Sequence, residues 1–307
     1  MSLKDVKAKI KSVDKIHKVT KAMEAVSAVK MRRSQETAIE ARPFALHSIG
    51  LLRRLVAHGE TTEHALVQHR DTQRRVLLVV ITSDRGLAGA LNSYVFRRVH
   101  RLLQERNWSK DDVSILAIGK KGYEHFAHRG FTVVEHLERW GEGVAFGDPD
   151  DLAHDIIDDY LKETYDRVML VYSNFDSTFN QEPVVRRLLP ISFAALEEVI
   201  EGIVPEKGKY SELHNVALKE SKEDYVFEPN PQAVLDQLLP YLVATVLYHA
   251  VLEANASEHS ARMVAMKSAS DRARDLSKEL TLLFNKERQA SITAEVSEIT
   301  SGIEAMK

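Results

Sequence analysis

The chain has 307 residues, of which 28% are charged and 44% hydrophobic, and its formal net charge is −3. This composition predicts a globular protein with one large domain or two modest ones, and the weakly acidic balance argues against a dedicated nucleic-acid binder. The absence of cysteine excludes disulfides, thiolate metal sites and cysteine catalysis. The charge is uneven, because residues 1–33 carry ten cations against three acidic residues.

The first predicted element is a long helix, and we assign residues 1–58 to an N-terminal coiled-coil segment. Residues 3–42 contain neither glycine nor proline, which permits about 40 helical residues. Apolar residues recur there every three or four positions, so one face should pack against another helix. These apolar positions are Leu3, Val6, Ile10, Val13, Ile16, Val19, Met23, Val26 and Val29.

The hydrophobic pattern then changes and indicates a central α/β domain, residues 74–195. β-branched runs alternate with helical segments, which predicts a Rossmann-like domain with a mostly parallel sheet. We expect the last two strands to pair as a hairpin, and the polar residues 205–228 to form an exposed loop. The expected strands are residues 74–82, 111–119, 131–137, 166–175 and 182–191, and the expected helices are 93–105, 120–128 and 148–165.

Residues 230–307 predict a second long helix. Asn230 and Pro231 suit a helix cap and first turn, and residues 241–301 hold no glycine or proline. The longest uncharged apolar run in this helix is residues 237–252. It is shorter than the roughly 20 residues needed to span a bilayer, so we expect no direct membrane insertion. Two long helices at opposite ends of a chain most simply pair as an antiparallel coiled coil.

Motifs for chemistry are weak in the central domain. Residues 86–91 do not match the dinucleotide-binding fingerprint, and no phosphate-binding P-loop occurs. The aspartates of residues 148–159 are explained better by a helix N-terminus, the first of them as its cap, than by a metal. His125 and His128 lack a metalloprotease spacing and are expected on the surface. We therefore predict no catalytic, cofactor-binding or metal site.

Longer and more specific patterns occur at the two ends of the chain and at points between them. They comprise residues 20–33, 257–276 and 284–302, with further matches at 83–92, 181–190 and 227–242. Together these segments closely resemble the gamma subunit of the rotary proton-translocating ATP synthase. Ala88 and Ala90 depart from the cysteine and glycine that are common at these positions in the family.

The resemblance implies a central stalk, non-catalytic by itself, that rotates within an alpha–beta hexamer and couples proton flow through the membrane sector to ATP synthesis in the beta subunits. The implied partners are the alpha and beta subunits, the epsilon subunit and the membrane rotor ring of c subunits. It implies one copy per complex, no nucleic acid, and the cytoplasmic face of the bacterial inner membrane. The implied beta-subunit contacts are Met23, Lys30, Arg32, Arg33, Arg262, Arg288, Gln289 and Thr293.

Two other functions fit parts of the sequence. A nucleotide-dependent α/β enzyme with helical extensions would bind its nucleotide in residues 74–195. A basic coiled-coil adaptor would bind anionic lipid or nucleic acid through the lysines of residues 4–21. For Met23, packing between the two long helices is an equal alternative to a contact with a beta subunit.

Overall fold

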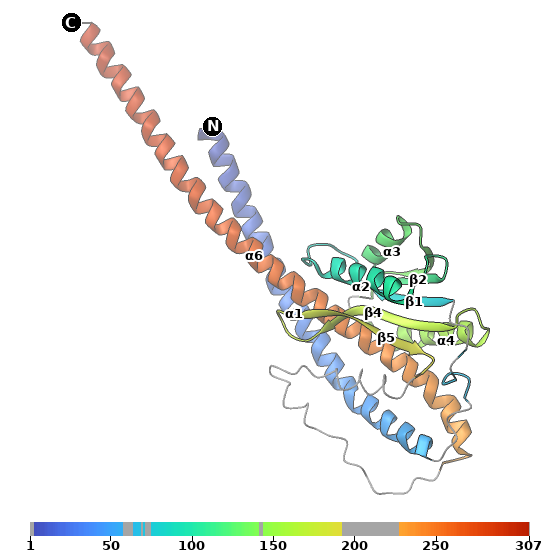
Figure 1. The fold of residues 1–307 in the computed structure, drawn as a ribbon. Coiled ribbons are helices and arrows are strands. Elements are labelled where there is room, and N and C mark those ends of the chain that lie inside the picture. The colour runs from blue at the N-terminus through green and yellow to red at the C-terminus, as the bar shows by residue number, and fades with distance from the viewer. Residues whose placement is uncertain are drawn as a thin grey trace. The chain divides into compact units, whose positions relative to one another are not determined.

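The computed structural model describes residues 3–57, 64–68, 70, 75–140, 144–191 and 227–306. It confirms the predicted fold class, which combines long terminal helices with a mostly parallel sheet (Figure 1). The chain forms two compact units, residues 1–27 with 263–307, and residues 28–262. The elements are α1 (Leu3–Ala57), β1 (Val76–Ile81), α2 (Leu91–Arg106), β2 (Val113–Ile118), α3 (Lys120–Ala127), β3 (Thr132–Leu137), α4 (Gly147–Leu161), β4 (Arg167–Phe175), β5 (Gln181–Leu189) and α6 (Pro231–Ala305).

The sheet has the strand order β3-β2-β1-β4-β5. Strands β1 to β4 are parallel, and β5 pairs antiparallel with β4, as predicted for a hairpin. All six residues of β1 are buried. A strand covered on both faces has no polar side, which explains its uninterrupted apolar sequence.

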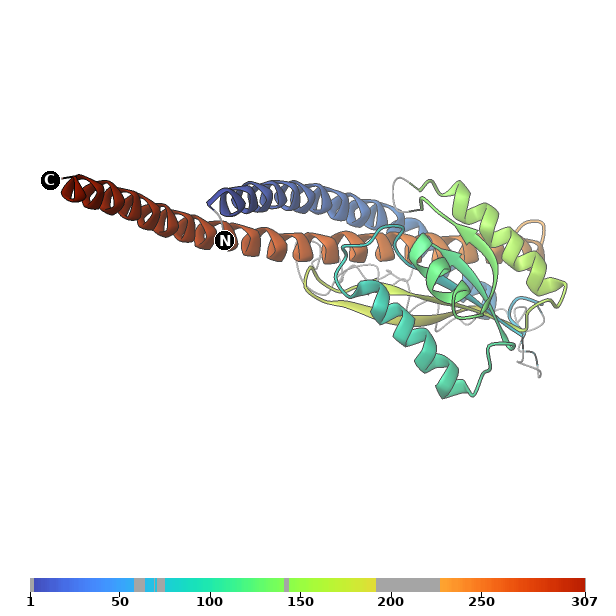
Figure 2. The ribbon, with the colours of Figure 1, turned by 90° about the horizontal axis from the view of Figure 1, so that it is seen from above.

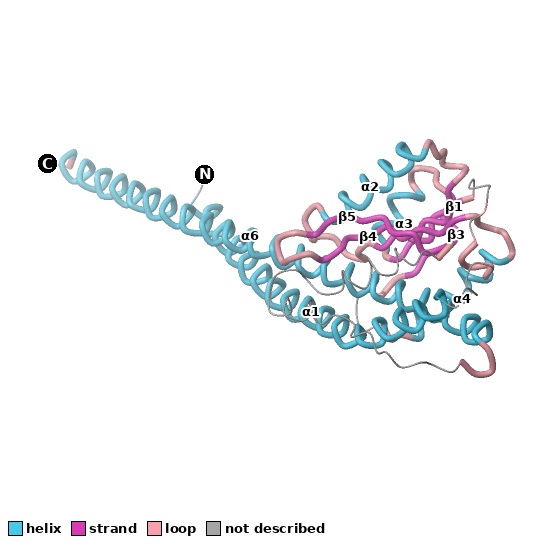
Figure 3. Tube along the Cα trace, turned by 60° about the horizontal axis from the view of Figure 1, so that its bottom comes forward, coloured by secondary structure: helices cyan, strands magenta, loops and turns pink. Residues whose placement is uncertain are grey.

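Each face of the sheet has its own core. On one face α2 and α3 contribute Val95, Val99 and Phe126, and on the other α4 and α6 contribute residues such as Ile156 and Leu247. Figure 3 shows α2 on one side of the strands and α4 with α6 on the other. The successive crossover helices therefore cover both faces, as in a doubly wound α/β fold.

Both long helices continue through prolines. Helix α1 passes Pro43 and ends at Ala57, and α6 passes Pro240. The Asn230 side chain caps α6 as expected, because its Oδ1 accepts a hydrogen bond from the Ala233 amide at 2.8 Å. Helix α6 includes a stretch that is long and apolar enough to cross a membrane by length and composition, but most of that stretch is buried in the core.

The start of α4 differs from the sequence prediction. Helix α4 begins at Gly147 without a side-chain cap, so the expectation that Asp148 caps it is wrong. Asp148 instead lies in the first turn, where its charge favours the helix N-terminus. The predicted loop at residues 205–228 lies outside the described residues except for its last two positions.

Within the unit of residues 1–27 and 263–307, α1 and α6 form the predicted antiparallel pair (Figures 1 and 2). Asp14 Oδ1 accepts a hydrogen bond from the Ser277 hydroxyl at 2.6 Å. His17 Nδ1 lies 3.0 Å from the Ser270 carbonyl oxygen. Because the partner number falls as the α1 number rises, the two helices run in opposite directions.

The seam of this coiled coil differs from the predicted apolar row. Ile16, Val19, Val26 and Val29 are 50–67% exposed, so they do not form the seam. One set of buried or half-buried positions instead follows a regular alternation of three and four residues, which is the coiled-coil period. They are Leu3, Val6, Ile10, Val13, His17, Thr20, Glu24 and Ser27 on α1, and Met263, Met266, Ser270, Ala273, Ser277, Leu280 and Phe284 on α6.

Candidate functional site

The carboxyl end of the sheet is bonded to one short segment of α6. The Asn255 amide donates to the Trp140 carbonyl at 2.8 Å, and the Ser257 hydroxyl donates to the Ser173 carbonyl of β4 at 2.9 Å. One turn later, the Ser260 hydroxyl donates to the carbonyl of Thr178, in the turn between β4 and β5, at 2.7 Å. We call Asn255, Ser257, Ser260 and Arg262 the α6 clamp. It connects the loops of several strands to one helix.

Arg262 completes the α6 clamp at the loop that follows β1. Its guanidinium is buried, donates to the carbonyls of Arg85 and Gly86 at 3.2 Å each, and pairs with Glu258 at 2.6 Å. Burial raises the pKa of Glu258, and the Arg262 cation opposes that rise. The two side chains therefore form a buried ion pair in which the Arg262 cation favours the ionised form of Glu258.

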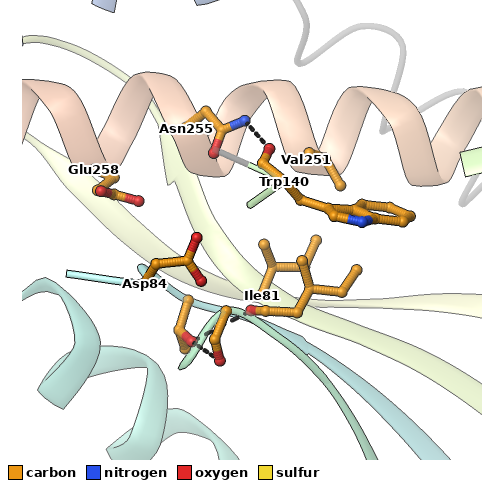
Figure 4. A pocket seen from close by; sticks show the side chains of 9 residues that line it. Ile81, Asp84, Trp140, Val251, Asn255 and Glu258 are labelled. Carbon is orange, nitrogen blue, oxygen red and sulfur yellow. Dashed lines mark hydrogen bonds between the residues drawn. The ribbon is translucent and has the colours of Figure 1, made fainter. Parts of the chain in front are cut away.

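A small pocket lies beside this ion pair at the carboxyl ends of β1 and β2, with room for about one water molecule. Asp84 and Glu258 line it together with Asn255 (Figure 4). The Asp84 carboxylate accepts hydrogen bonds from the amides of Lys120 and Arg139 at 3.0 and 2.9 Å. In open α/β sheets this region is the crevice that receives a ligand, and here the side chains of α6 occupy much of it.

The turn after β2 brings two backbones close together. Gly119 has φ +100°, and a Cβ atom at this position would lie 2.0 Å from the Thr82 carbonyl oxygen. The Thr82 hydroxyl in turn accepts a hydrogen bond from the Gly122 amide at 2.8 Å. Only glycine meets both the backbone angle and the lack of space.

The predicted contact residues lie in different surroundings. Arg32 and Arg33 are exposed on α1, while Lys30 and Met23 are half-buried, Met23 next to the seam. Arg288, Gln289 and Thr293 are exposed and share a short stretch of α6. Arg262 differs from all of these, because its guanidinium is engaged inside the chain.

His125 is not the surface residue that the sequence predicted. It is half-buried, its ring stacks on Phe96 at 3.7 Å, and its Nε2 lies 3.4 Å from His100 Nε2. Burial lowers the pKa of His125 to about 4, so the ring is neutral near pH 7. The pair therefore joins α2 to α3 as packed, uncharged rings.

Sequence reasoning missed the α6 clamp except for Arg262. Ser257 and Ser260 belong to a stretch of small residues in α6. Their hydroxyls donate hydrogen bonds to the backbone carbonyls of Ser173 and Thr178. The feature of the sequence that could have indicated the α6 clamp is a set of uncharged polar residues directly after an apolar helical stretch.

Comparisons with known proteins agree with this architecture. The family model described as ATP synthase matches residues 2–306. The ATP synthase gamma chain of Heliobacterium modesticaldum is 40% identical over 99% of both chains, and that of Roseiflexus castenholzii is 39% identical over 99% of this chain and 98% of its own. The chain belongs to the ATP synthase gamma family.

Solved structures of ATP synthases share the fold. A chain from the central stalk and c-ring of the Tetrahymena thermophila mitochondrial enzyme is 26% identical, with a TM-score of 0.58 over 82% of this chain and 99% of its own. A chain from the Euglena gracilis mitochondrial enzyme has a TM-score of 0.63 at 19% identity, over 99% of this chain and 94% of its own. Family membership makes the chain a gamma-type, central-stalk subunit of ATP synthase, as the sequence resemblance implied.

Proposed function

We propose that the chain is the rotating shaft of a proton-driven ATP synthase. Its paired terminal helices turn inside a hexamer of alpha and beta subunits and couple proton flow to ATP synthesis in the beta subunits. The observation that carries this proposal is family membership over residues 2–306, in a chain whose two ends form an antiparallel helix pair. The chain itself supplies no reacting group, because rotation acts by shifting each beta subunit between conformations.

The surface of the unit formed by residues 1–27 and 263–307 indicates a partner that encloses it. Ile292, Val296, Ile299 and Ile303 recur every three or four residues on α6 and are 51–63% exposed. An exposed apolar row of this kind usually marks an interaction site. We place it inside an apolar collar formed by the hexamer, where Arg288, Gln289 and Thr293 meet the beta subunits on the same part of the shaft.

The cations of α1 suit a reversible contact. Arg32 and Arg33 are exposed, so pairs with acidic beta loops would contribute only about 0–1 kcal/mol each. Weak pairs of this type let the shaft leave one beta subunit and engage the next. Met23 and Lys30 extend the same contact, and Arg262 contributes through the loop that it holds.

The α/β unit is the proposed foot of the shaft. It would bind the epsilon subunit and the ring of c subunits at the cytoplasmic face of the bacterial inner membrane, without inserting into the membrane or binding nucleic acid. The α6 clamp would carry torque from this foot to the shaft, because it ties several strand ends to the same helix. Rotation of the foot would then turn α6 without slipping.

Reversing two charges tests the cationic contact. We expect Arg32→Glu/Arg33→Glu to weaken assembly with the alpha–beta hexamer about fivefold to tenfold at low salt, and less at high salt, because exposed pairs are screened. Surface plasmon resonance at two salt concentrations measures this. Arg97→Glu/Arg101→Glu, with two exposed arginines on α2, makes the same charge change as a control. Equal losses of affinity in both variants would show that Arg32 and Arg33 do not make the proposed contact.

The proposed function itself is tested by reconstitution. The full chain is mixed with purified alpha and beta subunits, and the mass of the assembly is measured by native mass spectrometry. We expect one copy of the chain for three alpha and three beta subunits, and negligible ATP hydrolysis by the chain alone. Failure to assemble, or robust hydrolysis without partners, would overturn the proposal.

A further inference from the structure

Two titratable side chains are buried in the core between α6 and the sheet, where neither the stalk function nor the α6 clamp uses them. His249 and Glu253 are 0% and 6% exposed, and they lie one helical turn apart on α6. Side chains four residues apart on a helix are neighbours on one face. Both imidazole nitrogens of His249 and both carboxylate oxygens of Glu253 are buried without a well-formed hydrogen bond.

Few charged groups face this pair among the described residues. From β4, Tyr172 is fully buried, and from β5, Arg186 donates to the Tyr172 hydroxyl at 3.2 Å. The Tyr172 hydroxyl and the Arg186 cation are close enough to Glu253 to favour its ionised form. From α1, Glu40 acts on the neighbouring Tyr248. Burial without a salt-bridge partner favours the neutral form of both a carboxyl and an imidazole.

We propose that His249 and Glu253 form a compensating pair, in which the proton released by one group on unfolding is matched by the proton taken up by the other. The packing of α6 against the sheet then keeps a constant stability across mildly acidic pH. Each group alone would make that packing depend on pH, in opposite directions.

For Glu253, burial raises the pKa from 4.5 to about 7, against the opposing effects of Tyr172 and Arg186. Between these two values the folded chain holds a proton that the unfolded chain releases. Stability contributed by this group is therefore present below pH 4.5 and is lost as pH rises toward 7. The unfolding equilibrium constant increases about tenfold for each pH unit in that window.

For His249, burial lowers the pKa from 6.5 to about 4. Between these values the unfolded chain binds a proton that the folded chain does not, so stability rises with pH, again about tenfold per unit. The two windows overlap from about pH 4.5 to 6.5, where the opposite slopes cancel. Above pH 6.5 only the decline from Glu253 remains.

Single substitutions separate the two slopes. We compare the full chain with Glu253→Gln, with His249→Gln and with the double variant, between pH 5.0 and 6.5. The measurement is hydrogen exchange by mass spectrometry in α6 residues 245–257, corrected for the intrinsic exchange rate. Protection relative to the unsubstituted chain should rise about tenfold per pH unit in Glu253→Gln and fall about tenfold per unit in His249→Gln. The double variant should keep a constant ratio.

An exposed carboxyl on the same helix, Glu287, supplies the control, and Glu287→Gln should show no pH-dependent difference. If Glu253→Gln does not fold, His249→Gln still tests the proposal, because its protection relative to the unsubstituted chain must fall as pH rises. Flat ratios in both single variants would mean that neither group changes its protonation on opening, and this result overturns the proposal.

Discussion

Replacing Gly119 by alanine is expected to destabilise the α/β unit by about 3–5 kcal/mol or to prevent its folding. The added Cβ would lie 2.0 Å from the Thr82 carbonyl oxygen, at a position whose φ of +100° already disfavours a side chain. The clash is with backbone, so no rotamer change relieves it. Urea unfolding followed by far-UV circular dichroism measures the loss.

Gly130→Ala separates the two causes of that loss. Gly130 also has a positive φ, +74°, but an added Cβ would meet nothing within 4 Å. It should therefore cost only about 1 kcal/mol, the penalty for the backbone angle alone. If both variants lost the same stability, the close approach of Gly119 and Thr82 would not be the cause.

Arg262→Met is expected to cost about 3–5 kcal/mol, because it leaves the Glu258 carboxylate buried without its cation. It also removes both hydrogen bonds to the loop after β1. We expect faster hydrogen exchange in residues 83–92 and a lower urea midpoint. The double variant Glu258→Gln/Arg262→Met should regain part of the loss, because no unpaired charge remains.

Arg274 provides the matched control, because it belongs to an exposed ion pair. It pairs with Asp271 at 3.1 Å, and both side chains are about half exposed. Arg274→Met should therefore change stability by less than about 1 kcal/mol. An Arg262 variant that behaved like the Arg274 variant would show that the buried ion pair does not hold α6 to the loop after β1.

The strands and the long helices could be predicted from sequence because they depend on local patterns. The run in β1 is apolar throughout since both of its faces are covered, and the absence of glycine and proline permits long helices. The coiled-coil seam could not be predicted in this way. Its polar members, such as His17 and Ser270, become recognisable only when the opposite helix supplies their partners.

The misplaced seam has a physical cause. Ile16, Val19 and Val26 are apolar but exposed, so the hydrophobic pattern of α1 combines the seam with a second, outward surface. A pattern that combines two surfaces of one helix does not have the period of either. The same limit applies to Arg262, since a cation in a helix gives no sign in the sequence that backbone carbonyls far along the chain will bury it.

Rotation is the central claim, and single-molecule observation tests it most directly. An alpha–beta hexamer containing the chain is fixed to a surface, and a gold particle is attached to an exposed position of the α/β unit. On addition of ATP we predict unidirectional rotation of the particle with three dwell positions per turn, one for each beta subunit. Sustained ATP hydrolysis by the assembled complex with a particle that does not rotate would contradict the account.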